Sequence, residues 1–109
     1  MFSFLRRHTP EITVEELEEL RRERAVRVLD VREDWEFKRG HVPGSLHIPL
    51  KQLPARAGKL QRNVRYAVIC QSGSRSRSAT DFLVAQGFEG AVSVRGGTGA
   101  WARGGRPLE

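Results

Sequence analysis

The stretch that decides the fold runs from Tyr66 to Ser78 and reads YAVICQSGSRSRS. Its first residues, up to Cys70, are apolar without interruption, as expected for a strand covered on both faces. A loop rich in Ser, Gly and Arg follows, and beyond it Ala79, Phe82, Leu83 and Gln86 fall at helical spacing. Strand, loop and helix in this order predict an α/β domain, in which ligands bind at the carboxyl ends of the strands.

The alternation of helix and strand continues on both sides of this stretch. Thr13 and Glu16 form a capping-box pattern, and the apolar residues after Thr13 recur at helical spacing. Further strands are predicted at 26–31, 46–48 and 91–94, with helical segments within 33–39 and 50–60. We therefore expect a central, mainly parallel sheet of about five strands, flanked by helices on both faces.

The length of 109 residues suits one domain that spans residues 1–109. Charged residues make up 29% of the chain and hydrophobic residues 39%, which argues against global disorder. No apolar run approaches the roughly 20 residues that cross a bilayer. The first seven residues lack the basic-then-apolar order of a secretory signal. We expect no membrane contact and a cytoplasmic protein.

The formal charge of +6 is carried mostly by arginine, which accounts for 16 of the 19 basic residues. A coding bias or a thermophilic background explains such a composition without any functional role. The alternative is attraction to anions, among them small oxyanions and nucleic acid. The basic residues are spread along the chain without interleaved aromatic residues, so nucleic-acid binding is not indicated.

Cys70 is the only cysteine, so no internal disulfide can form. Alone, such a residue is either a buried small hydrophobe or a reactive thiol. The loop after it favours the second reading, because amide groups around Gly73 and the following helix start can hold a negative charge. Arg75 and Arg77 would add positive charge. Both effects stabilise a thiolate, so a reactive thiol in an anion-binding loop is predicted.

Three blocks in the chain resemble the rhodanese family. Residues 70–76, CQSGSRS, match the family's active-site loop C-x-x-G-x-R-S at every signature position. Residues 28–49, VLDVREDWEFKRGHVPGSLHIP, are similar to a second family pattern, which ends in G-H-I-P-G-A-x-N-I-P. Residues 96–101, GGTGAW, resemble the family's G-G-x-x-x-W ending. The likeness implies one rhodanese-like domain with a core of about 12–107.

The resemblance implies a sulfurtransferase of the thiosulfate type. Cys70 would accept a sulfane sulfur from thiosulfate or a persulfide donor and pass it to cyanide or a thiol, a protein thiol included. Arg75 would attract the anionic donor. The loop residues implied in binding are Gln71, Ser72, Gly73, Ser74, Arg75 and Ser76. No metal or organic cofactor is implied.

Supporting roles are expected at the end of the strand within 26–31. Asp30 and Arg32 are expected to lie near the loop and to brace it. Glu36 stands four residues after Arg32, and an ion pair between the two is predicted for a helical turn.

Aromatic residues and histidines in the same region are expected to be structural. The resemblance implies that His41 shapes a turn, although its chemistry also suggests a general base, and a structural role is expected for His47 as well. Trp35, Phe37 and Trp101 are expected to be core or packing residues rather than to form a substrate cage.

Two other functions remain as alternatives. A cysteine phosphatase or arsenate reductase also cradles an oxyanion over a thiolate, but its C-x5-R loop needs arginine at position 76, where this chain has Ser76. Ile69 also stands where such phosphatases usually have histidine. The second alternative is a non-catalytic rhodanese-like module that binds a partner or senses redox state. Such modules typically lack the cysteine that this chain retains.

Overall fold

The computed structural model describes residues 8–109 and has a five-stranded sheet in which all strands run parallel. The strand order is β1-β5-β4-β2-β3. The strands are β1 (Glu11–Ile12), β2 (Arg27–Asp30), β3 (Leu46–His47), β4 (Tyr66–Ile69) and β5 (Val92–Val94). The predicted α/β class and parallel sheet are confirmed. The first seven residues, considered above for a secretory signal, lie outside the described residues.

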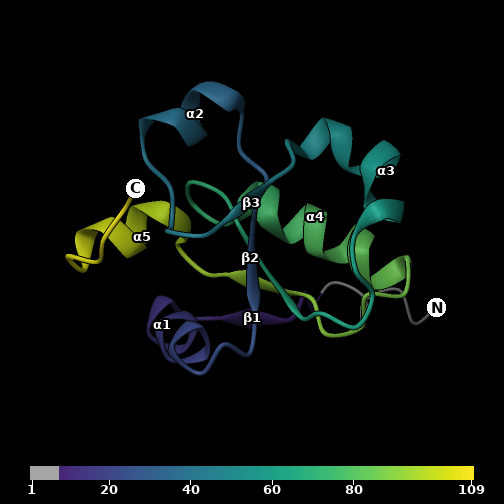
Figure 1. Cartoon of the computed structure of the whole chain (residues 1–109), viewed down its shortest axis with the longest axis horizontal. Helices are drawn as coiled ribbons and strands as arrows, with labels where there is room; N and C mark the ends of the chain where they lie inside the picture. Colours follow the sequence, from purple (N-terminus) through teal and green to yellow (C-terminus); the bar gives the residue numbers. More distant parts are fainter. Residues whose placement is uncertain (1–7) are drawn as a thin grey trace.

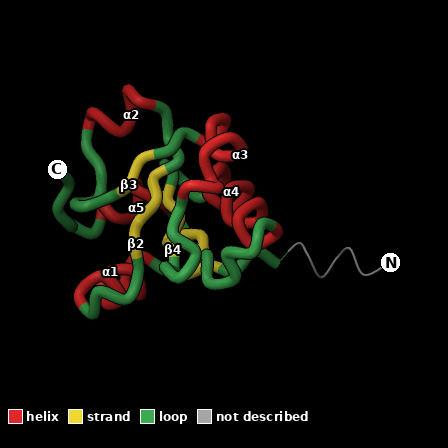
Figure 2. The backbone as a smooth tube through the Cα atoms, turned by 45° about the vertical axis from the view of Figure 1, so that its right-hand side comes forward, coloured by secondary structure: helices red, strands yellow, loops and turns green. Residues whose placement is uncertain are grey.

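Helices cover both faces of the sheet, as predicted. They are α1 (Val14–Arg22), α2 (Asp34–Arg39), η2 (Leu50–Gln52), α3 (Leu53–Arg56), η3 (Ala57–Lys59), α4 (Ser74–Ala85) and α5 (Gly97–Arg103). Figure 1 shows α1 and α5 on one side of the sheet and α3 and α4 on the other. The turned view of Figure 2 shows α2 away from both layers, near the carboxyl-terminal segment. No residue of α2 is buried.

The core has two parts, one on each face of the sheet, and β4 contributes to both. Tyr66, Val68 and Cys70 pack with residues of α3 and α4, whereas Ala67 and Ile69 pack with residues of α1 and α5. Successive side chains of a strand point to opposite faces, so a strand covered on both sides must be apolar at every position. This requirement explains the continuous apolar run at 66–70.

The local signals for α1 are confirmed. The Thr13 hydroxyl accepts a hydrogen bond from the Glu16 amide at 3.1 Å, and the Thr13 amide donates to Glu16 Oε1 at 2.8 Å. Val14 and Leu17 of the helix are buried. This capping box satisfies two amides that the first helical turn leaves without partners.

The parallel arrangement gathers three loops at the carboxyl end of the sheet. The amide of Val31, after β2, donates to the carbonyl of Ile69 at the end of β4. The amide of Thr98, after β5, donates to the carbonyl of Cys70 at 2.8 Å. The three blocks that resemble the rhodanese family are far apart in the sequence, and they therefore meet around Cys70. Within residues 8–109, no helix is long and apolar enough to cross a membrane.

Candidate active site

The sulfur of Cys70 lies in a cradle of backbone amides. Cys70 directly follows β4 and is 1% exposed. Its Sγ accepts hydrogen bonds from the amide of Gly73 at 3.1 Å and from the amide of Ser76 at 3.3 Å. Gly73 caps α4 with φ at 111°, a left-handed conformation that glycine adopts without strain. This turn aims the amides of the loop and of the first turn of α4 at the sulfur.

These contacts stabilise a negative charge on the sulfur. Burial raises the pKa of the Cys70 thiol, but hydrogen bonds from the Ser76 side chain and from the amides of Ser76, Gly73 and Ser72 outweigh it. The pKa of Cys70 is therefore lowered below that of an ordinary cysteine. The thiolate is the nucleophilic form of cysteine, so the cradle increases the reactive fraction at neutral pH.

A buried hydroxyl pair lies beneath the sulfur. Ser76 Oγ is 3.5 Å from Cys70 Sγ and 3.0 Å from the carbonyl oxygen of Gly73, and its one proton can be donated to either. It also shares a hydrogen bond of 2.8 Å with Ser93 Oγ, which comes from the buried strand β5. The link to Ser93 fixes Ser76 against the sheet, and sequence reasoning gave no signal for this partner.

The start of α5 supports the loop from the opposite side. Thr98 donates through its amide to the carbonyl of Cys70 and through its hydroxyl to Gln71 Oε1, at 2.8 and 3.0 Å. The Gly99 amide donates to the Gln71 carbonyl at 3.0 Å. Gly97 lies so close that a Cβ there would overlap the carbonyl oxygen of Cys70. The glycine pair at 96–97 thus permits a backbone contact that holds the loop.

Arg75 forms an ion pair with Glu36 of α2. Its Nη1 and Nη2 donate to the two carboxylate oxygens at 2.7 and 2.9 Å. The Arg75 side chain lowers the pKa of Glu36 to about 2. The predicted pair between Glu36 and Arg32 is therefore wrong, because α2 turns this carboxylate toward α4. The pair ties the helix after the loop to the helix after β2.

Arg32 instead pairs with Asp30, two residues earlier. Arg32 Nη2 donates to Asp30 Oδ2 at 2.7 Å and to the carbonyl of Gly40 at 2.8 Å, so it joins the end of β2 to the end of α2. Both side chains are buried. Within residues 8–109 neither side chain has a hydrogen bond to residues 70–76. Any bracing of the loop by this pair is indirect, through the position of α2.

A cleft of about 430 Å³ lies beside the loop, between α2 and α5. Its walls include Gln71 and Thr98 on one side and Trp35, Glu36 and Arg39 on the other. Trp35 is 61% exposed, so the part of the expectation that placed it in the core is wrong. Trp101 is buried, as expected.

The two histidines have structural contacts. The ring of Phe37 stacks between those of His41 and His47, at centroid distances of 3.6 and 4.2 Å. His41 Nδ1 is hydrogen-bonded to the carbonyl of Phe37, and His47 Nε2 to the carbonyl of Arg32. These contacts occupy one nitrogen of each imidazole and fit the expected structural role.

The loop residues singled out in the sequence have different positions. Gly73 and Ser76 contact the sulfur, and Gln71 lines the cleft. Ser72 and Ser74 are exposed at the loop surface, and Arg75 is held by Glu36. The contacts that sequence reasoning missed are those of Glu36, Ser93 and Gly97 with the loop. Glu36 and Gly97 had a signal as parts of the second and third blocks, whereas Ser93 had none.

Comparison with known proteins agrees with this geometry. The model of the rhodanese-like domain matches residues 13–103. A protein of Allochromatium vinosum named sulfurtransferase is 34% identical over 83 residues, 76% of this chain and 78% of that protein. The Bacillus subtilis protein YrkF is 37% identical over 93 residues, 84% of this chain; the chain spans 50% of YrkF's length.

A solved structure supports the same assignment. The crystal structure of a rhodanese-related protein from Thermoplasma volcanium superimposes with a TM-score of 0.86 at 37% identity. The match covers 92% of this chain and 97% of that one. Because the family model covers most of the chain, and relatives above 30% identity align over more than two thirds of it, the chain belongs to the rhodanese-like domain family.

Proposed function

We propose that this protein is a sulfurtransferase in which Cys70 carries the sulfur as a persulfide. The observation that carries the proposal is the cradle around Cys70, in which the amides of Gly73 and Ser76 point at Sγ. Membership in the rhodanese-like family and the relative named sulfurtransferase support it. The cradle would stabilise the thiolate before transfer and the anionic terminal sulfur afterwards.

Sulfur loading is a displacement at the sulfane sulfur of the donor. With thiosulfate, the Cys70 thiolate attacks the outer sulfur, a new S–S bond forms, and the bond to the sulfonate sulfur breaks. Sulfite leaves with the electron pair, and Cys70 holds a terminal sulfur that bears the negative charge. A persulfide donor reacts in the same way, and its thiolate is then the leaving group.

Unloading is the reverse type of displacement. A cyanide ion or thiolate attacks the terminal sulfur, and the S–S bond to Cys70 breaks. Thiocyanate or a new persulfide leaves, and the Cys70 thiolate is restored. The cradle stabilises this leaving group as it stabilises the attacking thiolate, so one arrangement serves both half-reactions.

Burial of Cys70 restricts the partners that can react. With 1% of the residue exposed, only the narrow terminal end of a donor or acceptor reaches Sγ while the loop holds its position. The remainder of the donor would occupy the cleft lined by Gln71, Trp35 and Arg39. We propose that this cleft also admits an exposed thiol or persulfide of another protein, in addition to thiosulfate.

The test is a thiocyanate assay with thiosulfate and cyanide, combined with mass spectrometry of the protein after the donor alone. We expect turnover and a mass increase of about 32 Da on Cys70, the mass of one sulfur atom added as a persulfide. Cys70→Ser should lose both, whereas Ser78→Ala, an exposed change on α4, should keep both. Neither turnover nor adduct in the unchanged protein would refute the proposal and favour a non-catalytic module.

A further inference from the structure

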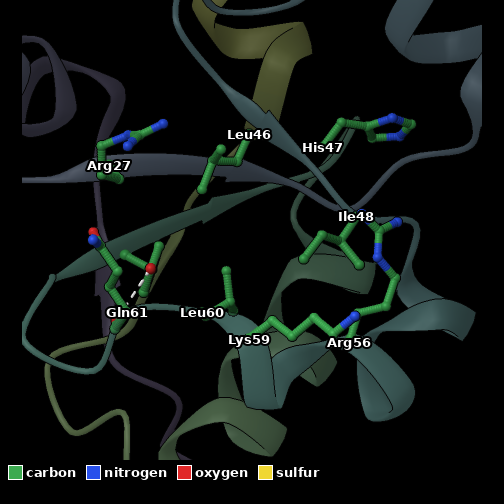
Figure 3. Close-up of a pocket in the computed structure, with 9 residues that line it drawn as sticks. Arg27, Leu46, His47, Ile48, Arg56, Lys59, Leu60 and Gln61 are labelled. Atoms are coloured by element: carbon green, nitrogen blue, oxygen red, sulfur yellow. Dashed lines mark hydrogen bonds between the residues drawn. The ribbon is translucent and has the colours of Figure 1, made fainter.

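A second cavity, of about 400 Å³, lies at the β3 edge of the sheet. Figure 3 shows Leu46 and Ile48 pointing from the β3 segment toward Leu60, with Arg27 and Arg56 on opposite sides. None of the residues that line this cavity also lines the cleft beside Cys70. The cavity is therefore a separate feature of the molecule that the proposed sulfur chemistry does not use.

The cavity exists because β3 and its covering segment are both short. β3 has two residues, so it covers only the end of β2. The segment 50–60 is broken into η2, α3 and η3, with Pro54 and Gly58 preventing one continuous helix. Leu46 and Leu60 remain only partly buried in consequence. These side chains form an apolar wall that no part of residues 8–109 fills.

Three cations surround this apolar wall, and no carboxylate neutralises them. Arg27, Arg56 and Lys59 line the cavity and are exposed. Within the described part of the chain they form no ion pair, and neither Asp nor Glu lines the cavity. Arg56 donates from Nη1 to the side chain of Gln52, which leaves its other N–H groups available. Cations on the walls of one cavity give it a positive potential, which attracts an anion.

Neighbouring hollows add to the positive potential. Arg27 also lines two smaller hollows together with Arg21, Arg24 and Arg65, and over residues 8–109 these hollows contain no carboxylate either. The cavity at β3 differs from them by its larger apolar wall, which includes Tyr66. The hydroxyl of Tyr66 is already hydrogen-bonded to the carbonyl of Gln61, as the dashed line in Figure 3 shows.

We propose that this cavity binds a small organic acid with an apolar body and a carboxylate or sulfonate group. The apolar body packs on Leu46, Ile48 and Leu60, and the positive potential of Arg27, Arg56 and Lys59 around this wall attracts the anionic group. The volume falls within the range of roughly 300–1,000 Å³ that is typical of small-molecule sites. A purely polar anion would leave the apolar wall in water, and an uncharged molecule would leave the cations without a partner.

The test compares three probes, octanoate, octan-1-ol and acetate, by amide chemical-shift titration of the isotope-labelled Cys70→Ser protein. This background removes the reactive thiol from the experiment. We expect saturable shifts around Leu46, Ile48 and Leu60 with octanoate, at least about tenfold tighter than with octan-1-ol or acetate. Higher ionic strength should weaken octanoate binding, because the cations are exposed to solvent.

Matched variants complete the test. The double variant Arg27→Gln, Arg56→Gln should weaken the binding of octanoate at least about tenfold. Lys38→Gln removes an exposed charge outside the cavity, so it should leave the affinity for octanoate unchanged. Both sets of residues are exposed, and thermal melting would confirm that the variants are folded. Equal affinity for octanoate and acetate, shifts confined to the cleft beside residue 70, or unchanged affinity in the double variant would each overturn the proposal.

Discussion

Arg75 and Glu36 are joined by two parallel hydrogen bonds although they are 39 residues apart in the sequence. The pair links the first turn of α4, which holds the Cys70 cradle, to α2, which forms the far wall of the cleft. A bidentate carboxylate occupies the face of the guanidinium that an anionic donor would otherwise use. The geometry thus favours a bracing role for Arg75, whereas the resemblance implied a donor-recruiting role.

Variants of this pair distinguish the two roles. If Arg75 braces the loop, Arg75→Ala and Glu36→Gln should slow transfer from thiosulfate and from an uncharged persulfide donor to the same degree, by about tenfold, through misplacement of the cradle. We expect this result in steady-state kinetics with both donors. If Arg75 instead attracts the anionic donor, the pattern should be the opposite. Arg75→Ala should then slow transfer from thiosulfate only, and Glu36→Gln, which frees the guanidinium, should speed transfer from thiosulfate.

Arg39 is the better candidate for attracting an anionic donor. It lines the cleft, it is exposed, and it forms no ion pair within residues 8–109. We expect Arg39→Gln to lower kcat/KM for thiosulfate by about threefold or more, since a charge at the rim acts mainly on encounter. Use of an uncharged persulfide donor should not change. Lys38→Gln, one residue away but outside the cleft, serves as the control. An equal fall in kcat/KM for thiosulfate in Lys38→Gln would mean that the net charge of the protein, rather than the position of Arg39, attracts the donor.

Acid should remove the contribution of the Glu36–Arg75 pair to stability. The Arg75 hydrogen bond lowers the pKa of Glu36 from 4.5 to about 2, so the folded state holds the carboxylate ionised more strongly than the unfolded state does. The stabilisation is complete above pH 4.5 and disappears as the pH falls to about 2. At neutral pH it should be about 1 kcal/mol, because the pair is partly exposed.

Urea unfolding of the unchanged protein and of Glu36→Gln from pH 7 down to pH 2 measures this effect. The difference in unfolding free energy should be constant above pH 4.5 and vanish near pH 2. Glu23→Gln, at an exposed site without an ion pair in the described residues, provides the comparison. A difference for Glu36→Gln that persists unchanged at low pH would show that the substitution acts through packing rather than charge.

Local patterns in the sequence predicted most of the fold. The apolar run at 66–70 and the capping box at Thr13 depend on neighbouring residues, and both are found as expected. β1 was missed because its two residues are a strand only through pairing with β5, with Glu11 opposite Ser93. A segment this short has no periodicity of its own.

The site was predictable only where its contacts are local. The cradle lies within seven consecutive residues from Cys70, so its residue types indicated its chemistry. The partner of Glu36 depends on how α2 approaches α4, and the local i to i+4 rule selected Arg32 instead of Arg75. Trp35 was expected to be a core or packing residue, yet α2 buries none of its residues. Such contacts depend on how the helices pack against one another in the tertiary structure.

Ser76 should tune the reactivity of Cys70. Its hydroxyl and amide both contribute to the lowered pKa of the thiol. Ser76→Ala keeps the amide and removes the hydroxyl, so the pKa of Cys70 should rise. The pH dependence of alkylation by iodoacetamide measures the midpoint. Ser78→Ala on the exposed face of α4 should leave the midpoint unchanged, and an equal midpoint in Ser76→Ala would mean that the amides alone stabilise the thiolate.

Gly97 should be intolerant of any side chain. Its φ is 58°, and a Cβ would overlap the carbonyl oxygens of Cys70 and Gln71. We expect Gly97→Ala to lower the free energy of unfolding by about 2–4 kcal/mol, since the strained loop or α5 must shift. Gly58→Ala, where a Cβ would meet open space, should change it by no more than about 0.5 kcal/mol.

The same pair of variants reports on the active loop itself. Because the amides of Thr98 and Gly99 hold the carbonyls of Cys70 and Gln71, a shift of α5 moves the loop that aims the amides at the sulfur. Gly97→Ala should therefore slow alkylation of Cys70 under conditions where the variant is still folded, and Gly58→Ala should not. A destabilised Gly97→Ala protein with unchanged thiol reactivity would mean that the cradle keeps its geometry without support from α5.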